Sequence, residues 1–440
     1  MRIKGKIKTL SSLIFAAIAV VARGECDLSA IFAESAAWDM TAVDFTIEHK
    51  DAGLKFASKE RNIVNSLVKG SSRWCGFPVW EAKVYFGRKG VERLELSLYN
   101  RGDDTLDSDM CVDKLIAMLG EIESKVIDKR KSRNLKTQRR EVRGEGVRFT
   151  RELKGSSPFV VLDWGINGKL KKEQSVEFLR ATVTRAKRDE SSVPAKKITG
   201  KVAIEKVKKN VTKNDEGDIW IKNVPMVDQG SKGYCAAAVS ERVLRYYGHA
   251  VDEHEIAQMA GSSALGGTSI AEMKATVKAV GSKCRLGYNE IVSFVASYDD
   301  LVKEIGLYNK IAEKANEKVI DIEQYMVGGM VDLGQIKLEM NPKILKKMRE
   351  KDPRFKKFIA GVTRHISLGV PVIWGVEMGI YPEPECPQAR GGHMRLIIGY
   401  NKETKEILYS DTWGAGHELK RMPEDWAFAV THEAFLLRPL

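Results

Sequence analysis

The sequence predicts an α+β protein of two domains, on three observations. A chain of 440 residues is too long for one ordinary hydrophobic core, so two or three domains are expected. Residues 187–218 are polar and charged with few large apolar side chains, which is typical of a linker. After residue 219, helical patterns come first and strand-like runs fill the end of the chain. We therefore expect a small α+β domain at 25–186, a linker at 187–218 and a second α+β domain at 219–440.

The first residues, 1–24, have the pattern of a signal peptide. A start rich in Lys and Arg precedes an apolar run from Leu10 to Ala22, which is short for a membrane span. Val20 and Ala22 form a small-residue cleavage signature, and no later run is apolar enough to span a membrane. We expect a secreted or periplasmic protein, with membrane attachment only if this segment stays uncleaved.

The composition indicates a globular, basic protein. Its net charge of +13 favours contact with an anionic surface such as an acidic envelope polymer, although a solvated basic surface accounts for the charge equally well. The densest basic segment, residues 129–151, is expected to be a solvated helix end and linker. Nucleic acid is not an expected partner.

The cysteine pattern excludes two classes of small-domain scaffold. Six cysteines are sparse for an exported chain of this length, which argues against a disulfide framework. No pair has C-x-x-C or other metal-ligand spacing, so no metal or cofactor is expected. A Cys75–Cys111 bridge within the first domain is one possible pairing.

The first domain has a clear hairpin and one clear helix. Residues 80–85 and 91–99 alternate between apolar and polar and are joined by a Gly-containing turn, with Leu94, Leu96 and Leu98 expected in a core. Residues 110–127 have the spacing of an amphipathic helix. The runs 159–164 and 176–183 read as further strands.

The second domain changes from helices to strands along its length. A helical pattern begins at Cys235, a second spans 270–280, and 289–364 reads mostly as helices. Three strands are expected at 370–375, 393–400 and 406–410, the last two joined by a charged turn at 401–405.

Cys235 stands where a reactive thiol is expected. It lies at the first turn of its predicted helix, where unpaired N–H groups and the helix dipole favour a thiolate, which is the nucleophilic form. Taken alone, a cysteine among small residues is more often a buried apolar side chain, so partners are needed.

The strand-rich end supplies these partners. His393 begins one predicted strand and Asp411 ends the next, at similar distances from the turn, so they are expected side by side. A carboxylate fixes the imidazole tautomer, and the imidazole can take the thiol proton. Gln229, six residues before Cys235, can donate to an oxyanion together with the Cys235 backbone N–H. His417 and His365 are weaker candidates for the base, because neither begins a strand paired with an Asp.

The layout Gln229-x₅-Cys235, a distant His393 and Asp411-Thr-Trp-Gly resembles the papain-like cysteine peptidases. Within them it most resembles the branch typified by the peptidases that process double-glycine bacteriocin leaders. The resemblance covers about 220–287 and 365–440 and leaves about 288–364 as a helical insertion. It implies a papain-like fold, in which a helical lobe carries the cysteine and an antiparallel β lobe carries the histidine and aspartate. It also implies that Gly392 and Trp413 border the substrate, with Trp413 shielding the His–Asp pair.

These patterns lead to one expected function and two alternatives. The expected function is an exported cysteine endopeptidase that hydrolyses peptide or protein substrates through Cys235, His393 and Asp411, with Gln229 as oxyanion donor. One alternative is acyl transfer to an amine, as in transglutaminase-like enzymes, which amine incorporation into peptides would reveal. The other is a catalytically silent, peptidase-like binding module, which failure to react with a thiol-directed probe would reveal. Cleavage of the 187–218 linker is expected to release the second domain from inhibition by the first.

Overall fold

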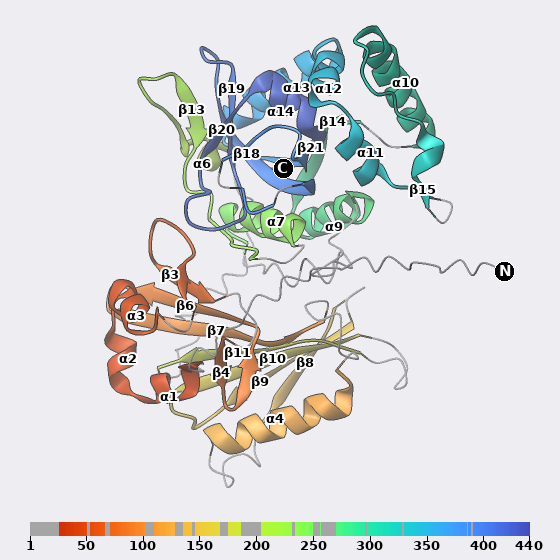
Figure 1. Cartoon of the computed structure of the whole chain (residues 1–440). Helices are drawn as coiled ribbons and strands as arrows, with labels where there is room; N and C mark the ends of the chain where they lie inside the picture. The colour runs from red at the N-terminus through yellow and green to blue at the C-terminus, as the bar shows by residue number, and fades with distance from the viewer. Residues whose placement is uncertain are drawn as a thin grey trace, which may run out of the picture.

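The computed structural model divides the chain into two domains, the first below the second in Figure 1. It describes residues 26–50, 53–66, 71–101, 110–127, 135–142, 146–167, 175–185, 204–230, 234–249, 256, 270–294, 297–327, 330–384, 386–388 and 390–440. The predicted signal segment and residues 187–203 of the predicted linker lie outside the described residues.

The first domain is built on one antiparallel sheet. Its strands follow the order β2-β3-β6-β7-β11-β10-β9-β8, and a small sheet of β1, β4 and β5 lies beside it. The strands are β1 (Cys26–Asp27), β2 (Lys55–Phe56), β3 (Ile63–Ser66), β4 (Ser72–Trp74), β5 (Phe77–Val79), β6 (Glu81–Gly87), β7 (Gly90–Asn100), β8 (Thr137–Val142), β9 (Gly146–Leu153), β10 (Phe159–Asn167) and β11 (Ser175–Thr184). The helices are α1 (Leu28–Ala33), α2 (Ser35–Asp39), α3 (Ala42–Glu48) and α4 (Val112–Val126).

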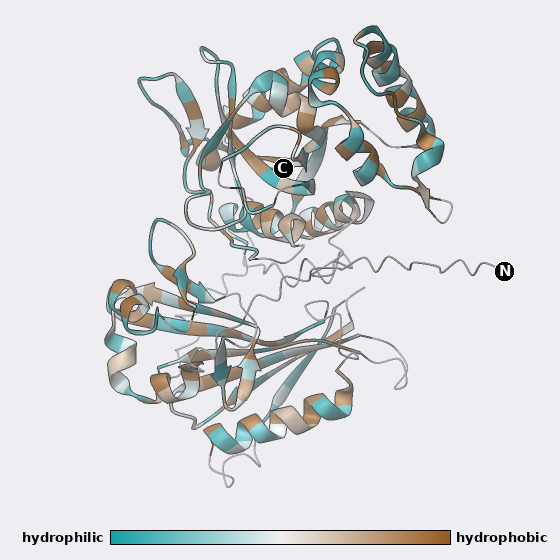
Figure 2. Ribbon diagram, in the orientation of Figure 1, coloured by the Kyte–Doolittle hydropathy of each residue, from teal (hydrophilic) through white to brown (hydrophobic). Residues whose placement is uncertain are grey.

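The predicted hairpin and helix of this domain are confirmed. Strands β6 and β7 pair antiparallel down to Gly87 opposite Gly90. Leu94, Leu96 and Leu98 are each at most 2% exposed, as the alternation predicts. Helix α4 buries one apolar face, and Figure 2 shows its hydrophilic and hydrophobic residues on different sides. The strands expected at 159–164 and 176–183 are β10 and β11, which complete the sheet.

The expectation of a helix end and linker at 129–151 is wrong where the structure describes this segment. Residues 137–142 and 146–153 are strands β8 and β9, which pair antiparallel at one end of the sheet. Among the described strands β8 pairs with β9 alone, and its Arg139 and Arg140 side chains are exposed. A high density of Arg therefore did not exclude a strand, because an edge strand buries few side chains.

The second domain contains the longer list of elements. The helices are α6 (Ile204–Lys208), α7 (Cys235–Tyr246), α9 (Ile270–Lys283), α10 (Tyr298–Lys314), the 3₁₀ helix η3 (Ile322–Tyr325), α11 (Leu333–Glu339), α12 (Pro342–Glu350), α13 (Arg354–Ile366) and α14 (Glu424–Val430). The strands are β12 (Val211–Lys213), β13 (Asp218–Ile221), β14 (Leu286–Ser293), β15 (Met326–Val327), β16 (Met330–Val331), β17 (Val372–Met378), β18 (Gly391–Asn401), β19 (Glu406–Ser410), β20 (Lys420–Pro423) and β21 (Thr431–Pro439).

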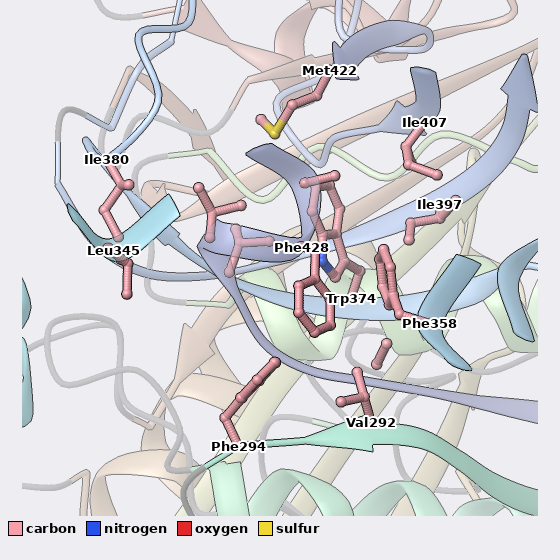
Figure 3. Packing of buried hydrophobic residues seen from close by; sticks show 14 of the residues in the cluster. Val292, Phe294, Leu345, Phe358, Trp374, Ile380, Ile397, Ile407, Met422 and Phe428 are labelled. Atoms are coloured by element: carbon pink, nitrogen blue, oxygen red, sulfur yellow. The ribbon is translucent and has the colours of Figure 1, made fainter. Parts of the chain in front are cut away.

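The sheet of this domain is covered on both faces. Its strands follow the order β12-β13-β18-β17-β21-β14, with β19 and β20 added beside β18. Apolar residues of α7 and α9 pack on one face, and those of α12, α13 and α14 pack on the other. Trp374 is fully buried among the second group, near Phe358 and Phe428 (Figure 3). This double cover explains why β17 is buried along its whole length.

Two predicted boundaries of the second domain shift. Residues 204–218, expected in the linker, form α6 and β12, and β12 pairs with β13 of the second sheet. The predicted insertion begins within β14, which pairs with β21 over Leu286–Ser293. Strands β12 and β14 stand first and last in the strand order of the sheet, and both are only partly buried, so they can carry charged residues.

Two further expectations concern a disulfide bond and membrane-spanning helices. The described part of the chain includes all six cysteines, and all are free, so the Cys75–Cys111 bridge is not formed. Of the helices that the structure describes, none is long and apolar enough to cross a membrane.

Candidate active site

Cys235 is the first residue of α7, as the sequence predicts. Small and aliphatic residues follow it, and Ala236 to Leu244 are all buried, so the helix is fixed against the sheet and presents its N-terminus. Burial by itself would raise the pKa of the Cys235 thiol, but its interaction with His393 and contacts with the Met394 and Ala236 backbone lower that pKa below its usual value. The thiol is therefore set up to ionise.

His393 lies in β18 between the thiol and a carboxylate. Its Nε2 and the Oδ1 of Asp411 are 2.6 Å apart, and both side chains are fully buried. Its Nδ1 is buried, makes no hydrogen bond of standard geometry among the described residues, and is the atom left for the Cys235 thiol. Burial alone would lower the pKa of His393, but Asp411 and Cys235 raise it to about 9. The imidazole thus holds a proton beside a thiol that tends to lose one.

Asp411 reaches His393 by a different register from the one expected. The turn at 401–405 joins β18 and β19 as predicted, but Leu396 lies opposite Ser410. A bulge between Ile397 and Gly399 shifts the register by one residue, so Asp411 comes level with Arg395, one residue nearer to His393 than an unbroken ladder from the turn would place it. Its carboxylate bridges the two side chains.

Gln229 is hydrogen-bonded to Thr412, the residue that follows Asp411. Its backbone N–H donates to the Thr412 carbonyl at 2.9 Å, and its side-chain Oε1 accepts a hydrogen bond from the Thr412 hydroxyl. Since Oε1 is used in this way, Nε2 is the atom of the amide that can donate to a developing oxyanion. Gln229 is 6% exposed, so its orientation is fixed by packing.

Trp413 and Gly392 both adjoin His393, Trp413 through its ring and Gly392 as the preceding residue of β18. The Trp413 ring stacks on the imidazole, with ring centroids 4.3 Å apart and planes within 1° of parallel. Gly392 is exposed at the start of β18, and a Cβ atom there would meet open space. Of the other candidate bases, His417 touches Trp413 edge-on, and His365 is near Asn289 of β14.

Two buried arginines that the sequence reading did not select also contact Asp411. The Arg395 Nε lies 2.8 Å from the Asp411 Oδ2, and the Arg395 guanidinium also pairs with Glu383. Arg242 of α7 donates to the Asp411 backbone carbonyl at 2.6 Å and to the Ser410 hydroxyl. Arg395 is a lone charge in an apolar strand segment, and this pattern is the signal that could have identified it.

The first domain contacts the loop that carries Gln229 and Cys235. The Asn100 amide at the end of β7 donates to the Tyr234 hydroxyl at 2.9 Å, and Tyr234 directly precedes Cys235. Asn65 of β3 hydrogen-bonds to Asp228, the residue before Gln229. A third contact joins Lys59 to Glu418, where the Lys59 N–H donates to the carboxylate at 3.1 Å.

A polar cavity of about 600 Å³ lies between the first sheet and α7. Its lining mixes acidic, basic and aromatic side chains, and α7 contributes Glu241 and Arg245. Helix α7 is therefore bordered by the first domain along its length as well as at its start.

The described residues include no group of three or more His, Cys, Asp or Glu side chains that could hold a metal ion. These residues instead bring together a thiol, an imidazole, a carboxylate and an amide donor, which together can carry out nucleophilic acyl chemistry.

The comparisons with known proteins agree with this chemistry. Residues 221–434 match the model of the Peptidase_C39 like family. A search of curated protein sequences finds no match to the chain. Among solved structures, the peptidase domain of Streptococcus ComA, described as a bi-functional ABC transporter involved in a quorum-sensing pathway, aligns at 12% identity with a TM-score of 0.25, covering 50% of this chain and all of that domain.

Xylellain, a cysteine protease from Xylella fastidiosa, aligns at 12% identity with a TM-score of 0.27, covering 54% of this chain and 89% of that one. Both TM-scores are low, so the family match carries the assignment. The match spans the predicted 288–364 insertion and most of the second domain, and begins only after the first domain has ended. The second domain thus resembles the C39-like peptidases, as its Gln, Cys, His and Asp motifs predict, and cysteine peptidase is the enzyme class that this family match supports.

Proposed function

We propose that the chain is an exported cysteine endopeptidase with a papain-like second domain, in which Cys235, His393 and Asp411 form the catalytic triad. The observation that carries the proposal is the buried 2.6 Å contact between His393 and Asp411, with the imidazole against a thiol at a helix start. In this layout α7 belongs to the helical lobe and β17, β18 and β19 to the β lobe.

The reaction begins with transfer of the Cys235 proton to His393. The thiolate attacks the carbonyl carbon of the scissile peptide bond, and the carbonyl oxygen becomes an oxyanion. The Gln229 amide and the Cys235 backbone N–H donate to this oxyanion, and each such donor typically lowers the barrier by about 3 kcal/mol.

The remaining steps return the enzyme to its starting state. His393 gives its proton to the leaving amine as the C–N bond breaks, which leaves an acyl group on the sulfur. A water molecule then attacks the thioester carbonyl carbon while its proton passes to His393. The carboxylic acid product leaves, and Cys235 regains its proton from His393. Asp411 keeps the imidazole oriented throughout and stabilises its charged form.

The test is covalent labelling of the reduced full-length protein with a peptidyl vinyl sulfone. We expect one adduct, at Cys235, which the Cys235→Ala variant abolishes. Cys111→Ala is the matched control, because Cys111 is an exposed thiol of the first domain and its removal should leave labelling unchanged. A folded wild-type protein that forms no adduct would support the silent binding module. Labelling together with amine incorporation into peptides, in place of hydrolysis, would support the acyl-transfer enzyme.

Export and the basic surface belong to the same proposal. The basic, apolar start of the chain supports secretion or delivery to the periplasm, and cleavage is expected after Ala22 or a close neighbour. N-terminal sequencing of the protein recovered from an expressing cell checks this, and an intact Met1 would contradict it. The net charge of +13 supports an anionic envelope polymer as a partner besides the peptide substrate.

A further inference from the structure

Arg395 holds a buried positive charge between two carboxylates. It is fully buried on β18, two residues after His393, so the two side chains lie on the same face of the strand. Its Nε is 2.8 Å from the Asp411 Oδ2, and its Nη1 donates to the Glu383 Oε1 at 2.9 Å. A buried guanidinium is strongly unfavourable unless it is paired, so Arg395 depends on these two carboxylates.

The contact with Arg395 fixes the direction of the Asp411 carboxylate. One oxygen, Oδ1, faces His393 and accepts the Thr412 backbone N–H at 2.9 Å. The other oxygen, Oδ2, faces Arg395. The Arg395 Nε lies close to Oδ2 without a hydrogen bond of standard geometry, so this contact is an ion pair, and its attraction opposes rotation of the carboxylate away from the imidazole. Burial would raise the pKa of Asp411, but His393 and Arg395 together hold it well below its usual range.

Glu383 completes the arrangement from outside the strand. It lies in the connection between β17 and β18, and its side chain is 7% exposed. The Tyr409 hydroxyl donates to its carboxylate, and the Arg395 guanidinium lies 4.7 Å from the centre of the Tyr409 ring. Glu383 thus gives Arg395 a second anion, and Tyr409 holds that anion in place.

The charges alternate in sign along this row. The row begins at the Glu383 carboxylate, which contacts Arg395, and Arg395 contacts Asp411. Asp411 in turn contacts the His393 imidazolium, which lies against the Cys235 thiolate. Arg242 of α7 contacts the Asp411 backbone carbonyl, and Glu418 acts electrostatically on Arg242. Each member of such a row affects the proton affinity of the members beyond it, because these side chains are shielded from water.

We propose that Arg395 is a positioning residue of the peptidase, which orients Asp411 and, with Glu383, sets the charge balance of the Cys235–His393 pair. This inference rests on the proposed function. It predicts that the pair works over a pH range set by two buried residues that do not touch the substrate.

The test measures the pH dependence of inactivation by a peptidyl vinyl sulfone, which requires no knowledge of the natural substrate. The rate rises as Cys235 loses its proton and falls as His393 loses its own. Arg395→Met removes a positive charge, which raises the proton affinity of both groups. We expect both limbs of the profile to move to higher pH by about one unit. Glu383→Gln removes a negative charge and should move both limbs to lower pH.

Two more variants separate orientation from charge. Arg395→Lys keeps the charge but loses the planar fork, so the limbs stay in place while the maximum rate falls about tenfold. The double variant Arg395→Met with Glu383→Gln restores the balance of charge and should bring the limbs back toward the wild-type positions. If Arg395→Met does not fold, the Glu383→Gln and Arg395→Lys profiles still decide the matter.

The matched control is Arg349→Met. Arg349 is also a buried arginine of the second domain, 3% exposed and 2.7 Å from Glu304, but it contacts none of the triad. This variant should lose stability and keep both limbs. Limbs that stay fixed in Arg395→Met and in Glu383→Gln would overturn the inference and leave Arg395 as a purely structural residue. A wild-type protein that never reacts with the probe would instead overturn the proposed function.

Discussion

The two domains are each built on a large antiparallel sheet with helices packed on it, yet they place their charged side chains differently. In the first sheet, ion pairs such as Arg93–Glu95 lie at the border of the interdomain cavity, where both side chains are partly exposed. In the second sheet, Asp411 and Arg395 are fully buried. The Asp411–Arg395 pair lies inside the packing of the second domain, whereas the Arg93–Glu95 pair of the first sheet is partly exposed.

Exposed and buried ion pairs differ in what they contribute to a protein. An exposed ion pair contributes little to stability, since water solvates its members equally well when they are apart. A buried ion pair pays a desolvation cost that only a specific arrangement offsets. The overall charge of +13 therefore says less about this protein than the few charges it encloses.

The largest expected effect is that of removing the buried carboxylate. Asp411→Ala leaves Arg395 without one of its partners, and breaking a buried pair in this way typically costs about 3–5 kcal/mol of unfolding free energy. It also removes the group that orients His393, so the maximum inactivation rate should fall by about 10³-fold or more. Urea denaturation measures the first effect and the vinyl sulfone reaction the second.

The matched variant in the first domain is Glu95→Ala. It breaks a pair of similar geometry, with Arg93 Nε and Glu95 Oε1 2.8 Å apart, but at a partly exposed position. The expected loss is about 1 kcal/mol or less, with no change in the inactivation rate. Equal losses of unfolding free energy in Asp411→Ala and Glu95→Ala would contradict the statement that the buried pair contributes more than the partly exposed one.

A smaller effect is expected at the border between the domains. Asn100 contacts Tyr234 and Asn65 contacts Asp228, so the first domain holds the residues next to Cys235 and Gln229. We propose that these contacts restrain the site and that cutting the chain within 187–203 relieves the restraint. With a specific protease site placed there, cleavage should raise the inactivation rate about tenfold, the effect of about 1.4 kcal/mol, which is the size of one or two net hydrogen bonds.

Dilution and two variants sharpen this experiment. Activation should increase as the cleaved protein is diluted, because the domains then have to reassociate from solution. Asn100→Ala should activate the uncut chain in part, since it removes one contact. Glu123→Ala breaks a pair with Arg151 within the first domain and should not activate it. An unchanged rate after complete cleavage, at every dilution, would show that the first domain does not restrain the site.

Much of the fold follows from local patterns in the sequence. The β6–β7 hairpin, helix α4, the start of α7 at Cys235 and the β18–β19 pair lie where periodicity and turn residues place them. The strands β8 and β9 were missed because both are rich in Arg, and β8, at the edge of the sheet, lacks the alternation of a half-buried strand. Strand β12 was missed for a similar reason, since it is short and its residues are only partly buried.

Some residues of the site could be predicted from local sequence patterns, and others depend on contacts between distant parts of the chain. Cys235, His393 and Asp411 stand at element ends that the sequence marks, and the geometry brings them together. Arg395 and Glu383 were missed because their pairing depends on the path of the β17–β18 connection, which no local pattern encodes. The β18–β19 register was also missed, because the bulge after Ile397 inserts one residue into β18 and the sequence of the turn at 401–405 does not predict it.

The stacking of Trp413 on His393 has an optical consequence. An indole lying parallel to an imidazole at 4.3 Å transfers excited-state electron density to the ring far more readily when that ring carries a proton. The emission of Trp413 should therefore be quenched while His393 is protonated and recover as it titrates. The difference spectrum between wild type and Trp413→Phe isolates this signal from the other tryptophans. The protein thus contains its own fluorescent indicator of the proton on which its chemistry depends.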